Sequence, residues 1–348
     1  MNTTDRTRAA ADIEARVTAA DRGDGGMRAV VQDRYGDAEV PAVRMIDRPK
    51  IAADEVLVRV EAAAVDRGVW HLMTGRPYAV RAAGYGIRRP KQPVPGRDLA
   101  GTVVEVGADV TDFSVGDAVY GIGTGTFAEY ARASAAKLAH RPEHLTAEQA
   151  ATLSVSGATA SQALFDRGAA RPGQRVLVLG ASGGVGSFAV QLAPRHGLHV
   201  TAVASAAKAD YARELGADVV LDYRTDDFTR EESFDLIVDI GGRNRLSKLR
   251  RALVRRGTLV IVGGEGGGSI TGGAGRQLRA VLLSPFVPQR LTAFVSDERA
   301  AARTPIHALA VAGDLVAPVD RTFSIDRATD ALRDLEAGRL RGKAVITI

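Results

Sequence analysis

The fold is decided by one stretch of sequence, Arg175-Val-Leu-Val-Leu-Gly-Ala-Ser-Gly-Gly-Val-Gly186. Its continuous apolar run is typical of a strand that is buried on both faces of a parallel sheet. The glycines that follow permit a tight turn and let backbone N–H groups approach a phosphate, and the next residues fit a helix whose N-terminus carries partial positive charge. We therefore predict a dinucleotide-binding turn between a strand and a helix. Its predicted residues are Gly180, Ser182, Gly183, Gly184, Val185 and Gly186.

The context of this turn supports the prediction, because its spacing is G-x-x-G-x-x-G rather than the usual G-x-G-x-x-G. From residue 175 onward, strand patterns alternate with helical patterns, which predicts an α/β fold with a doubly wound parallel sheet of the Rossmann type. The expected strands are 176–179, 200–203, 219–222, 236–239 and 259–262, with a sixth candidate at 291–295. The expected helices include 186–195, 207–215 and 299–312.

The end of the second expected strand indicates which dinucleotide binds. A site for NADH usually places an acidic residue there to hold the ribose 2′-hydroxyl. Here the strand ends at Ser205, with Lys208 and Tyr223 nearby in the sequence and no acidic residue at the position itself. A hydroxyl and an ammonium suit a 2′-phosphate, whereas a carboxylate would repel it. We therefore predict NADPH as the cofactor; the alternative for Lys208 is an ordinary solvated lysine.

Short strand patterns separated by glycines precede this region and predict an antiparallel, barrel-like unit. They cover residues 27–32, 56–62, 99–106 and 118–122. Residues 75–95 read as a long surface loop, and Thr146-Ala-Glu-Gln149 fits a capping box that opens a helix interrupted around residues 156–157. Residues 263–275 contain eight glycines and predict a flexible loop. The β pattern returns at 319–325 and 343–348, which could still belong to the first unit.

Composition excludes several classes of protein. The chain of 348 residues has no cysteine, which excludes disulfides, catalytic thiols and cysteine-ligated zinc. No apolar stretch approaches the ~20 residues of a membrane span, and the first 26 residues lack the apolar core of a secretory signal, so we expect a cytoplasmic protein with no membrane partner. The net charge is +5, but its 40 arginines and 6 lysines are scattered among 41 acidic residues, which argues against nucleic-acid binding.

Several ordered motifs carry a resemblance to a known family. They are GRDLAGTVVEVG at 96–107, GDAVYG at 116–121, TFAEY at 126–130, the glycine-rich turn itself, LGAD at 215–218 and RGKAVI at 341–346. With these motifs the chain resembles the zinc-independent medium-chain dehydrogenase/reductases, specifically the quinone oxidoreductase branch. The resemblance implies a GroES-like β-barrel-type substrate domain (27–145 and 313–348) around a Rossmann NADPH-binding domain (146–312). It also implies a homodimer joined at the edges of the Rossmann sheets. Residues 1–26 are polar and lack sustained periodicity, so we expect a flexible tail there.

The resemblance also bears on metal and chemistry. Zinc-dependent relatives hold a catalytic metal with a cysteine and with the histidine of a Gly-His-Glu motif, but this chain has Gly96-Arg97-Asp98 there, and Asp66 near the cysteine position. Arginine is not a practical zinc ligand, so we predict no zinc. The remaining chemistry is hydride transfer from NADPH to a quinone or to an α,β-unsaturated carbonyl compound.

By match to the family, Thr159 is expected near the nicotinamide, although its hydroxyl could equally bond its own helix backbone. The other expected cofactor contacts are Gly263 and Gly264 at the carboxamide, Ile240, Gly241 and Gly242 at the adenosine ribose, and Lys343 at the phosphates.

The substrate segment departs from the family pattern Asn-Pro-x-Asp, because Asp66 replaces the Asn and Val69 replaces the Asp. Asp66, Trp70 and His71 are then expected at the mouth of the cleft, although Trp70 could be a packing anchor and His71 an ordinary histidine. Tyr78 and Tyr85 lie in the 75–95 loop, a possible lid, and are candidate proton donors, although water could serve equally.

Two other functions stay open at this stage. The first is a tailoring reductase for a polyketide or polycyclic quinone, since long loops could admit a bulky substrate. The second is an NADPH-binding protein with little turnover that binds RNA or a protein. The absence of a clustered basic stripe or an aromatic stacking platform argues against the second alternative.

Overall fold

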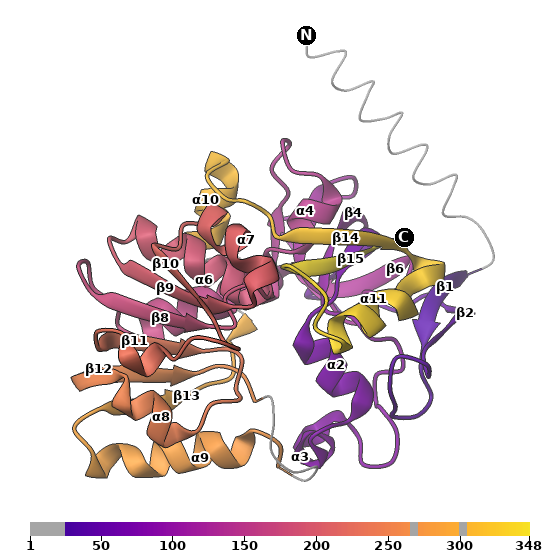
Figure 1. The fold of residues 1–348 in the computed structure, drawn as a ribbon. Coiled ribbons are helices and arrows are strands. Elements are labelled where there is room, and N and C mark those ends of the chain that lie inside the picture. Colours follow the sequence, from indigo (N-terminus) through magenta and orange to yellow (C-terminus); the bar gives the residue numbers. More distant parts are fainter. Residues whose placement is uncertain (1–24, 265–270, 299–304) are drawn as a thin grey trace, which may run out of the picture.

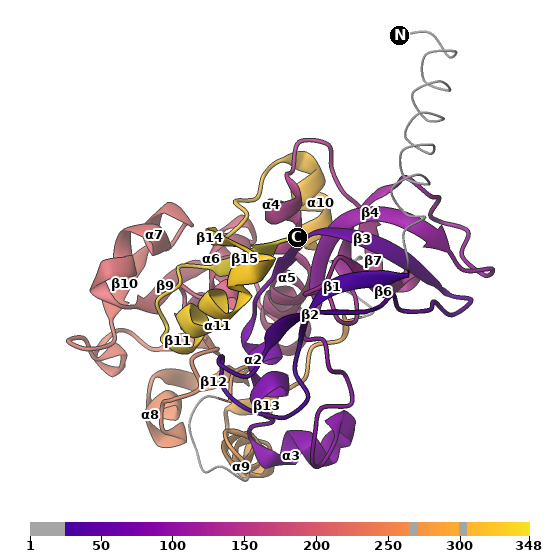
Figure 2. The same ribbon diagram turned by 90° about the vertical axis from the view of Figure 1, so that its right-hand side faces the viewer.

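A computed structural model describes residues 25–264, 271–298 and 305–348 of the chain. It contains two large sheets that lie side by side (Figure 1; Figure 2), with the chain passing from one to the other and back. The expectations for residues 1–24, for the centre of the glycine-rich loop and for the first residues of the helix at 299–312 lie outside the described residues.

The first sheet is entirely parallel and has the order β10-β9-β8-β11-β12-β13. Its strands are β8 (Arg175–Leu179), β9 (His199–Ala204), β10 (Val219–Asp222), β11 (Phe234–Asp239), β12 (Leu253–Ile261) and β13 (Arg290–Ala293). All six predicted strands are confirmed, although β12 begins six residues earlier than expected. This is the doubly wound parallel sheet that the sequence predicts.

Helices cover both faces of this sheet because successive side chains of each strand point to opposite faces. Val176 and Val178 of β8 pack with helices of one face, whereas Leu177 and Leu179 pack with those of the other. The helices of the first face are α5 (Ser154–Ser161), α6 (Gly184–Arg195), α7 (Ala209–Glu214) and α10 (Pro305–Ala312). Those of the second face are α8 (Leu246–Arg251) and α9 (Ala274–Leu283). Helix α9 therefore begins inside the predicted flexible loop 263–275.

The second sheet joins segments from both ends of the described chain, in the order β14-β15-β3-β4-β5-β7, with β6 paired to β3. Its strands are β3 (Glu55–Ala64), β4 (Asp98–Val106), β5 (Ala118–Ile122), β6 (Tyr130–Ser134), β7 (Leu138–His140), β14 (Val319–Ser324) and β15 (Lys343–Thr347). The pairs are antiparallel as predicted, except that β14 and β15 are parallel. A parallel pair needs a crossover, and α11 (Ala328–Glu336) supplies it. A separate antiparallel pair is formed by β1 (Gly26–Val31) and β2 (Ala42–Asp47).

Local signals explain several helix boundaries. The capping box at Thr146 is confirmed: its hydroxyl accepts a hydrogen bond from Gln149 N, and the Gln149 side chain accepts one from Thr146 N. Helix α4 (Ala147–Ala151) follows, and the break before α5 falls at residues 152–153, not at the predicted 156–157. The expected loop at 75–95 contains α3 (Tyr78–Val80) and a π-helical turn at Arg81–Tyr85, directly after α2 (Arg67–Thr74).

Candidate functional site

The glycine-rich turn lies at the carboxyl end of β8, where the chain enters α6. Gly180 has φ +87°, a conformation that favours glycine. A Cβ on Gly186 would lie 2.2 Å from the carbonyl oxygen of Gly180, so only glycine lets the helix start this close to the strand. At Gly183 an added Cβ would have nothing nearer than 3.7 Å, so a phosphate can approach the backbone there. Each glycine thus has one of the roles expected at a dinucleotide turn.

Two further loops leave the same edge of the sheet and pack directly on one another. Ile240, Gly241 and Gly242 follow β11, and Gly263 and Gly264 follow β12. A Cβ on Gly263 would lie 1.8 Å from the carbonyl oxygen of Ile240, so this contact requires glycine. In open parallel sheets, ligands bind at the carboxyl ends of the strands, which is where these loops and the phosphate turn meet.

An ion pair that the sequence did not reveal holds these two loops. Asp239, the last residue of β11, is fully buried and lies 2.5 Å from the guanidinium of Arg276 on α9. Arg276 also donates to the carbonyl oxygens of Asn244 and Gly263, while Asp239 accepts from Gly242 N. Burial raises the pKa of Asp239, and Arg276 opposes that shift. Arg276 therefore links the loop after β11 to the loop after β12.

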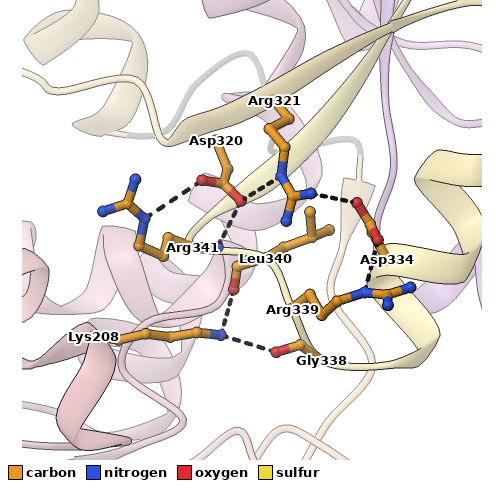
Figure 3. A network of polar contacts seen from close by, with 8 residues as sticks. All are labelled: Lys208, Asp320, Arg321, Asp334, Gly338, Arg339, Leu340 and Arg341. Atoms are coloured by element: carbon orange, nitrogen blue, oxygen red, sulfur yellow. Dashed lines mark hydrogen bonds and ion pairs between the residues drawn. The ribbon is translucent and has the colours of Figure 1, made fainter.

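At the end of β9, Lys208 lies in a network of charged residues (Figure 3). Its ammonium donates to the carbonyl oxygens of Gly338 and Leu340, at 3.0 and 2.6 Å. Burial lowers the pKa of Lys208, Asp320 raises it, and Arg341 lowers it again. Arg341 is held by Asp320 through its backbone N–H and its guanidinium. The structure thus brings a second cation to Lys208, which the sequence analysis missed because 133 residues separate the two positions.

The neighbouring candidates Ser205 and Tyr223 lie on the same side of the sheet. Ser205 follows β9 directly, and its carbonyl oxygen accepts from Lys208 N. Tyr223 follows β10, and its side chain is largely exposed, with Arg224 over its ring.

Lys343, expected at the cofactor phosphates, has a partner within the protein. Its side chain is only 1% exposed and its ammonium contacts the buried carboxylate of Asp98 on β4. The physical reason is that β15 lies inside the second sheet, where a buried cation requires a buried anion. Asp98 also accepts from Val155 N at 2.8 Å. Burial raises the pKa of Asp98 to about 6, although Lys343 favours the ionised form.

Asp66 is the N-cap of α2, where its Oδ1 accepts from Val69 N at 2.9 Å. Its Oδ2 is buried, and among the residues that the structure describes it has no hydrogen-bond partner. Asp66 lies close enough to Asp98 to raise the pKa of that carboxyl. The structure therefore leaves one buried oxygen of Asp66 available next to the charged pair.

Trp70 and His71 have the contacts expected if Trp70 is a packing anchor and His71 an ordinary histidine. Trp70 is partly buried against the core of the second sheet. Arg67 lies over its ring. His71 Nδ1 lies 2.8 Å from the carbonyl oxygen of Arg76. The hydroxyl of Thr159 likewise bonds its own helix backbone, since it donates to Val155 O at 2.7 Å within α5.

A cavity of about 280 Å³ lies beside α2 in the second sheet's half of the molecule. Its described wall includes Val69, Tyr85, Arg97 and Thr124, whereas Tyr78 is not part of it. The segment that carries Tyr85 is held by Tyr35, whose hydroxyl donates to Tyr85 O and Gly86 O. Of the two proposed tyrosines, only Tyr85 therefore contributes to this cavity.

Arg97 occupies the position of the missing zinc-ligand histidine. Its guanidinium forms an ion pair with Glu298, which also binds Lys137 at 3.0 Å. In the described part of the chain, no group of three or more His, Asp or Glu residues is arranged to hold a metal ion. No helix among the described residues has the length and apolarity to cross a bilayer.

Comparisons with known proteins agree with this architecture. Residues 52–143 match the family described as alcohol dehydrogenase GroES-like domain, and residues 215–346 match the one described as zinc-binding dehydrogenase. The human NAD(P)H oxidoreductase RTN4IP1, mitochondrial, is 31% identical, and the match covers 92% of this chain and 89% of that protein. The chain belongs to the zinc-independent medium-chain dehydrogenase/reductases, in the quinone oxidoreductase-like branch.

Other members of the family extend the comparison. A chloroplastic quinone oxidoreductase of Triphysaria versicolor is 29% identical over 92% of this chain and 98% of its own length. The solved quinone oxidoreductase of Coxiella burnetii has a TM-score of 0.80 and 26% identity, over 93% of this chain and 99% of that one. A mycobacterial structure solved with NADPH has a TM-score of 0.79 and 26% identity, over 92% of this chain and 100% of that one. The resemblance and the fold class predicted from sequence are thus confirmed, and the protein is a general oxidoreductase with a nicotinamide cofactor.

Proposed function

We propose that the protein is an NADPH-dependent, zinc-free reductase of quinones or α,β-unsaturated carbonyl compounds. The observation that carries this proposal is the pairing of the glycine turn with two cations, Lys208 and Arg341, on the β9 side of the sheet. Related proteins named quinone oxidoreductase and 2-methylene-furan-3-one reductase support the substrate class. A division into 27–145 with 313–348 and 146–312 is part of the same proposal.

The residues present fit the cofactor. Gly183 leaves open space for a phosphate, α6 directs its N-terminus there, and Lys208 and Arg341 supply positive charge for a 2′-phosphate. When bound, the nicotinamide supplies a hydride, and the acceptor also gains a proton. The chain's own contribution is to orient the two partners and to exclude water. Arg276 holds the loops Ile240–Gly242 and Gly263–Gly264 in place for this purpose.

For the proton we propose Asp66 or Tyr85, with water as the alternative donor. Asp66 presents a buried oxygen without a partner among the described residues, and Tyr85 lies in the wall of the 280 Å³ cavity. Thr159, Trp70 and His71 are proposed as walls of the site, since Thr159 and His71 lie at hydrogen-bond distance from backbone oxygens and Trp70 packs against the core of the second sheet. Tyr78, in α3, is proposed as part of the lid segment only.

A narrower function is supported by two matches. A polyketide synthase of Streptomyces halstedii, GfsB, is 35% identical over 285 residues, which is 78% of this chain but only 5% of that protein. The solved CurK enoyl reductase has a TM-score of 0.79 at 25% identity, over 93% of this chain and 99% of that one. These matches favour a tailoring reductase as the second candidate. No specific observation favours a binding protein with little turnover.

We also propose a homodimer and a cytoplasmic location. Strand β13 lies at the edge of the parallel sheet, and beside it Leu278, Val281, Leu282 and Phe286 are exposed on α9 and the turn that follows. The spacing of Leu278, Val281 and Leu282 places them along one side of α9, and Phe286 follows in the turn, so association would cover an apolar surface there.

Stopped-flow oxidation of NADPH and NADH tests the enzyme. The acceptors are a 1,4-benzoquinone, a naphthoquinone, a linear enone and a simple ketone. We expect turnover of the first three with a preference for NADPH and none of the ketone. Tight NADPH binding without oxidation by any acceptor would contradict a general reductase and favour a specialised substrate or a binding role.

A further inference from the structure

A second cavity, of about 750 Å³, opens between the N-terminal ends of α8 and α9. Four arginines line it: Arg243, Arg245, Arg276 and Arg279. Its described wall contains no aspartate or glutamate. The proposed cofactor site uses Gly242 and Arg276 of this wall, but it gives no role to Arg243, Arg245 or Arg279, so the charge of these three requires a separate explanation.

The cations of this wall are available to a ligand. Within the described residues, Arg243 and Arg245 have no ion-pair partner, and Arg279 donates from its Nε to Gly275 O. Arg276 is committed to Asp239, but its Nε is buried without a partner in the described part. Like-charged groups gathered around one hollow repel each other unless an anion enters. A guanidinium group can donate two parallel hydrogen bonds to two oxygens of one phosphate.

The cavity adjoins the cofactor loops. Gly242 belongs both to its wall and to the loop after β11, and Arg276 reaches from it to Gly263 O at 3.3 Å. Gly272, also in its wall, lies against Pro77 of the substrate half, since an added Cβ would be 3.0 Å from the proline ring. Figures 1 and 2 both show α3 next to α9. The cavity is therefore at the junction of the two halves.

Its place in the sheet separates it from the cofactor's own phosphates. In the order β10-β9-β8-β11-β12-β13, Lys208 follows β9 on one side of β8, and the arginine-lined cavity lies beyond β11 on the other side. A dinucleotide that places its 2′-phosphate at Lys208 and its diphosphate over the β8 turn keeps its phosphates on the β9 and β8 side of β11. An anion drawn to Arg243, Arg245 and Arg279 would therefore belong to a second ligand.

We propose that this cavity binds the phosphorylated tail of the electron acceptor, so that the substrates are unsaturated thioesters carried on a phosphopantetheine-type arm. This inference rests on the proposed function. In the reaction the acceptor gains a hydride at its β-carbon and a proton at its α-carbon, and NADPH becomes NADP⁺. The cavity volume lies within the 300–1,000 Å³ range of small-molecule sites. A carboxylate alone would leave most of it empty, and an unbranched apolar tail would leave the arginines without an anion.

The first test compares two acceptors with the same reacting group, crotonyl-CoA and the neutral crotonyl-N-acetylcysteamine. We expect a KM for crotonyl-CoA that is at least about tenfold lower. Crotonyl-phosphopantetheine distinguishes the phosphate of the arm from those of the nucleotide: a KM close to that of crotonyl-CoA assigns the cavity to the arm. The R243Q/R245Q variant should bring the KM values for crotonyl-CoA and the neutral ester within about threefold of one another. The R255Q/R256Q variant removes the same charge from exposed positions of β12 and should keep the wild-type ratio.

A binding measurement separates this inference from the proposed function. Calorimetry with free CoA and NADP⁺-saturated protein should show binding that R243Q/R245Q weakens about tenfold and R255Q/R256Q does not. The absence of cysteine excludes disulfide exchange with the CoA thiol. Reduction of quinones by a protein that binds no CoA overturns the inference alone. CoA binding at these arginines without reduction of any acceptor supports the cavity assignment but overturns the proposed function.

Discussion

The ammonium of Lys343 on β15 contacts the carboxylate of Asp98 on β4, and both side chains are buried. The pair lies next to Gly184 of the phosphate turn, since a Cβ added to that glycine would be 3.1 Å from Lys343 Cγ. One buried pair thus links the second sheet to the turn that begins α6.

Replacing one partner of this pair should be more harmful than replacing both. Lys343→Met leaves Asp98 buried without a counter-ion, which costs about 3–5 kcal/mol of unfolding free energy. In the D98N/K343M variant both charges are gone, and the oxygen of the new side-chain amide can still accept from Val155 N, so much of the stability should return. Denaturant unfolding of the wild type and the two variants measures the difference. Equal losses in the single and double variants would contradict a charge-based explanation.

Lys208 and Arg341 should determine the preference for NADPH. Lys208→Gln or Arg341→Gln removes one cation near the expected 2′-phosphate, and each should raise the KM for NADPH by roughly fivefold to tenfold, about 1 kcal/mol or slightly more. The KM for NADH should stay unchanged, because NADH lacks this phosphate. Arg339→Gln is the matched control, since Arg339 belongs to the same network but is held by Asp334 (Figure 3). A similar loss with Arg339→Gln would assign the effect to general charge.

As the pH rises, NADPH binding should weaken at a lower pH than it would if Lys208 had the pKa of an ordinary lysine. Burial lowers the pKa of Lys208 below its usual value of 10.5, so the ammonium loses its proton as the pH rises through that lowered value. The attraction between the Lys208 ammonium and the 2′-phosphate is complete below this pKa and is lost above it. Fluorescence titrations of NADPH and NADH against pH measure the effect. We expect a rising Kd for NADPH only, and a flat profile for both cofactors in Lys208→Gln.

Asp66 can be tested separately as a cap and as a reacting group. Asp66→Asn keeps an oxygen that accepts from Val69 N, so the melting temperature should hold, whereas Asp66→Ala should cost about 1 kcal/mol. If the buried Oδ2 delivers the proton, Asp66→Asn lowers kcat for an enone by roughly 100-fold. Unchanged kcat in Asp66→Asn would assign the proton to Tyr85 or water.

The apolar side of α9 should hold the proposed dimer together. Leu282 and Phe286 are exposed in the single chain, and Leu282→Lys with Phe286→Lys would place two charges on the surface that association buries. We expect light scattering to give the mass of a dimer for the wild type and of a monomer for this variant. A control, Val311→Lys, introduces a charge at an exposed apolar position on α10 and should leave the mass unchanged. A monomeric wild type would contradict the proposal directly.

The sequence predicted the elements whose signal lies within a few consecutive residues. The runs at 118–122 and 219–222 match β5 and β10 residue for residue, because an apolar strand between turn residues carries its own signal. The glycine turn and the capping box are equally local, since each depends on residues less than ten positions apart. The family resemblance then supplied the joining of the two chain ends in one sheet.

The sequence could not predict the partners that the charged side chains find. Lys343 meets Asp98 across 245 residues, and Lys208 meets the carbonyl oxygen of Leu340 across 132. Such pairs depend on strand order and on how loops at one sheet edge converge, which periodicity does not encode. Asp239 carried a weak signal, as an acidic residue ending a buried strand, but nothing near it in sequence indicated Arg276.

The pairing of β15 with β3 has a consequence for how the molecule is made. Val345 lies opposite Ala64 in this antiparallel pair, so the second sheet is joined by residues 281 positions apart in the chain. On the ribosome, β6 can pair early with residues 55–59 of β3, but residues 62–64 of the same edge stay uncovered until β15 emerges after the whole parallel sheet. Closing so long a loop is slow, and an uncovered edge invites aggregation. We therefore expect folding of the parallel sheet to precede this closure, because its completed β8–α6 turn gives Lys343 and its strand a surface on which to dock.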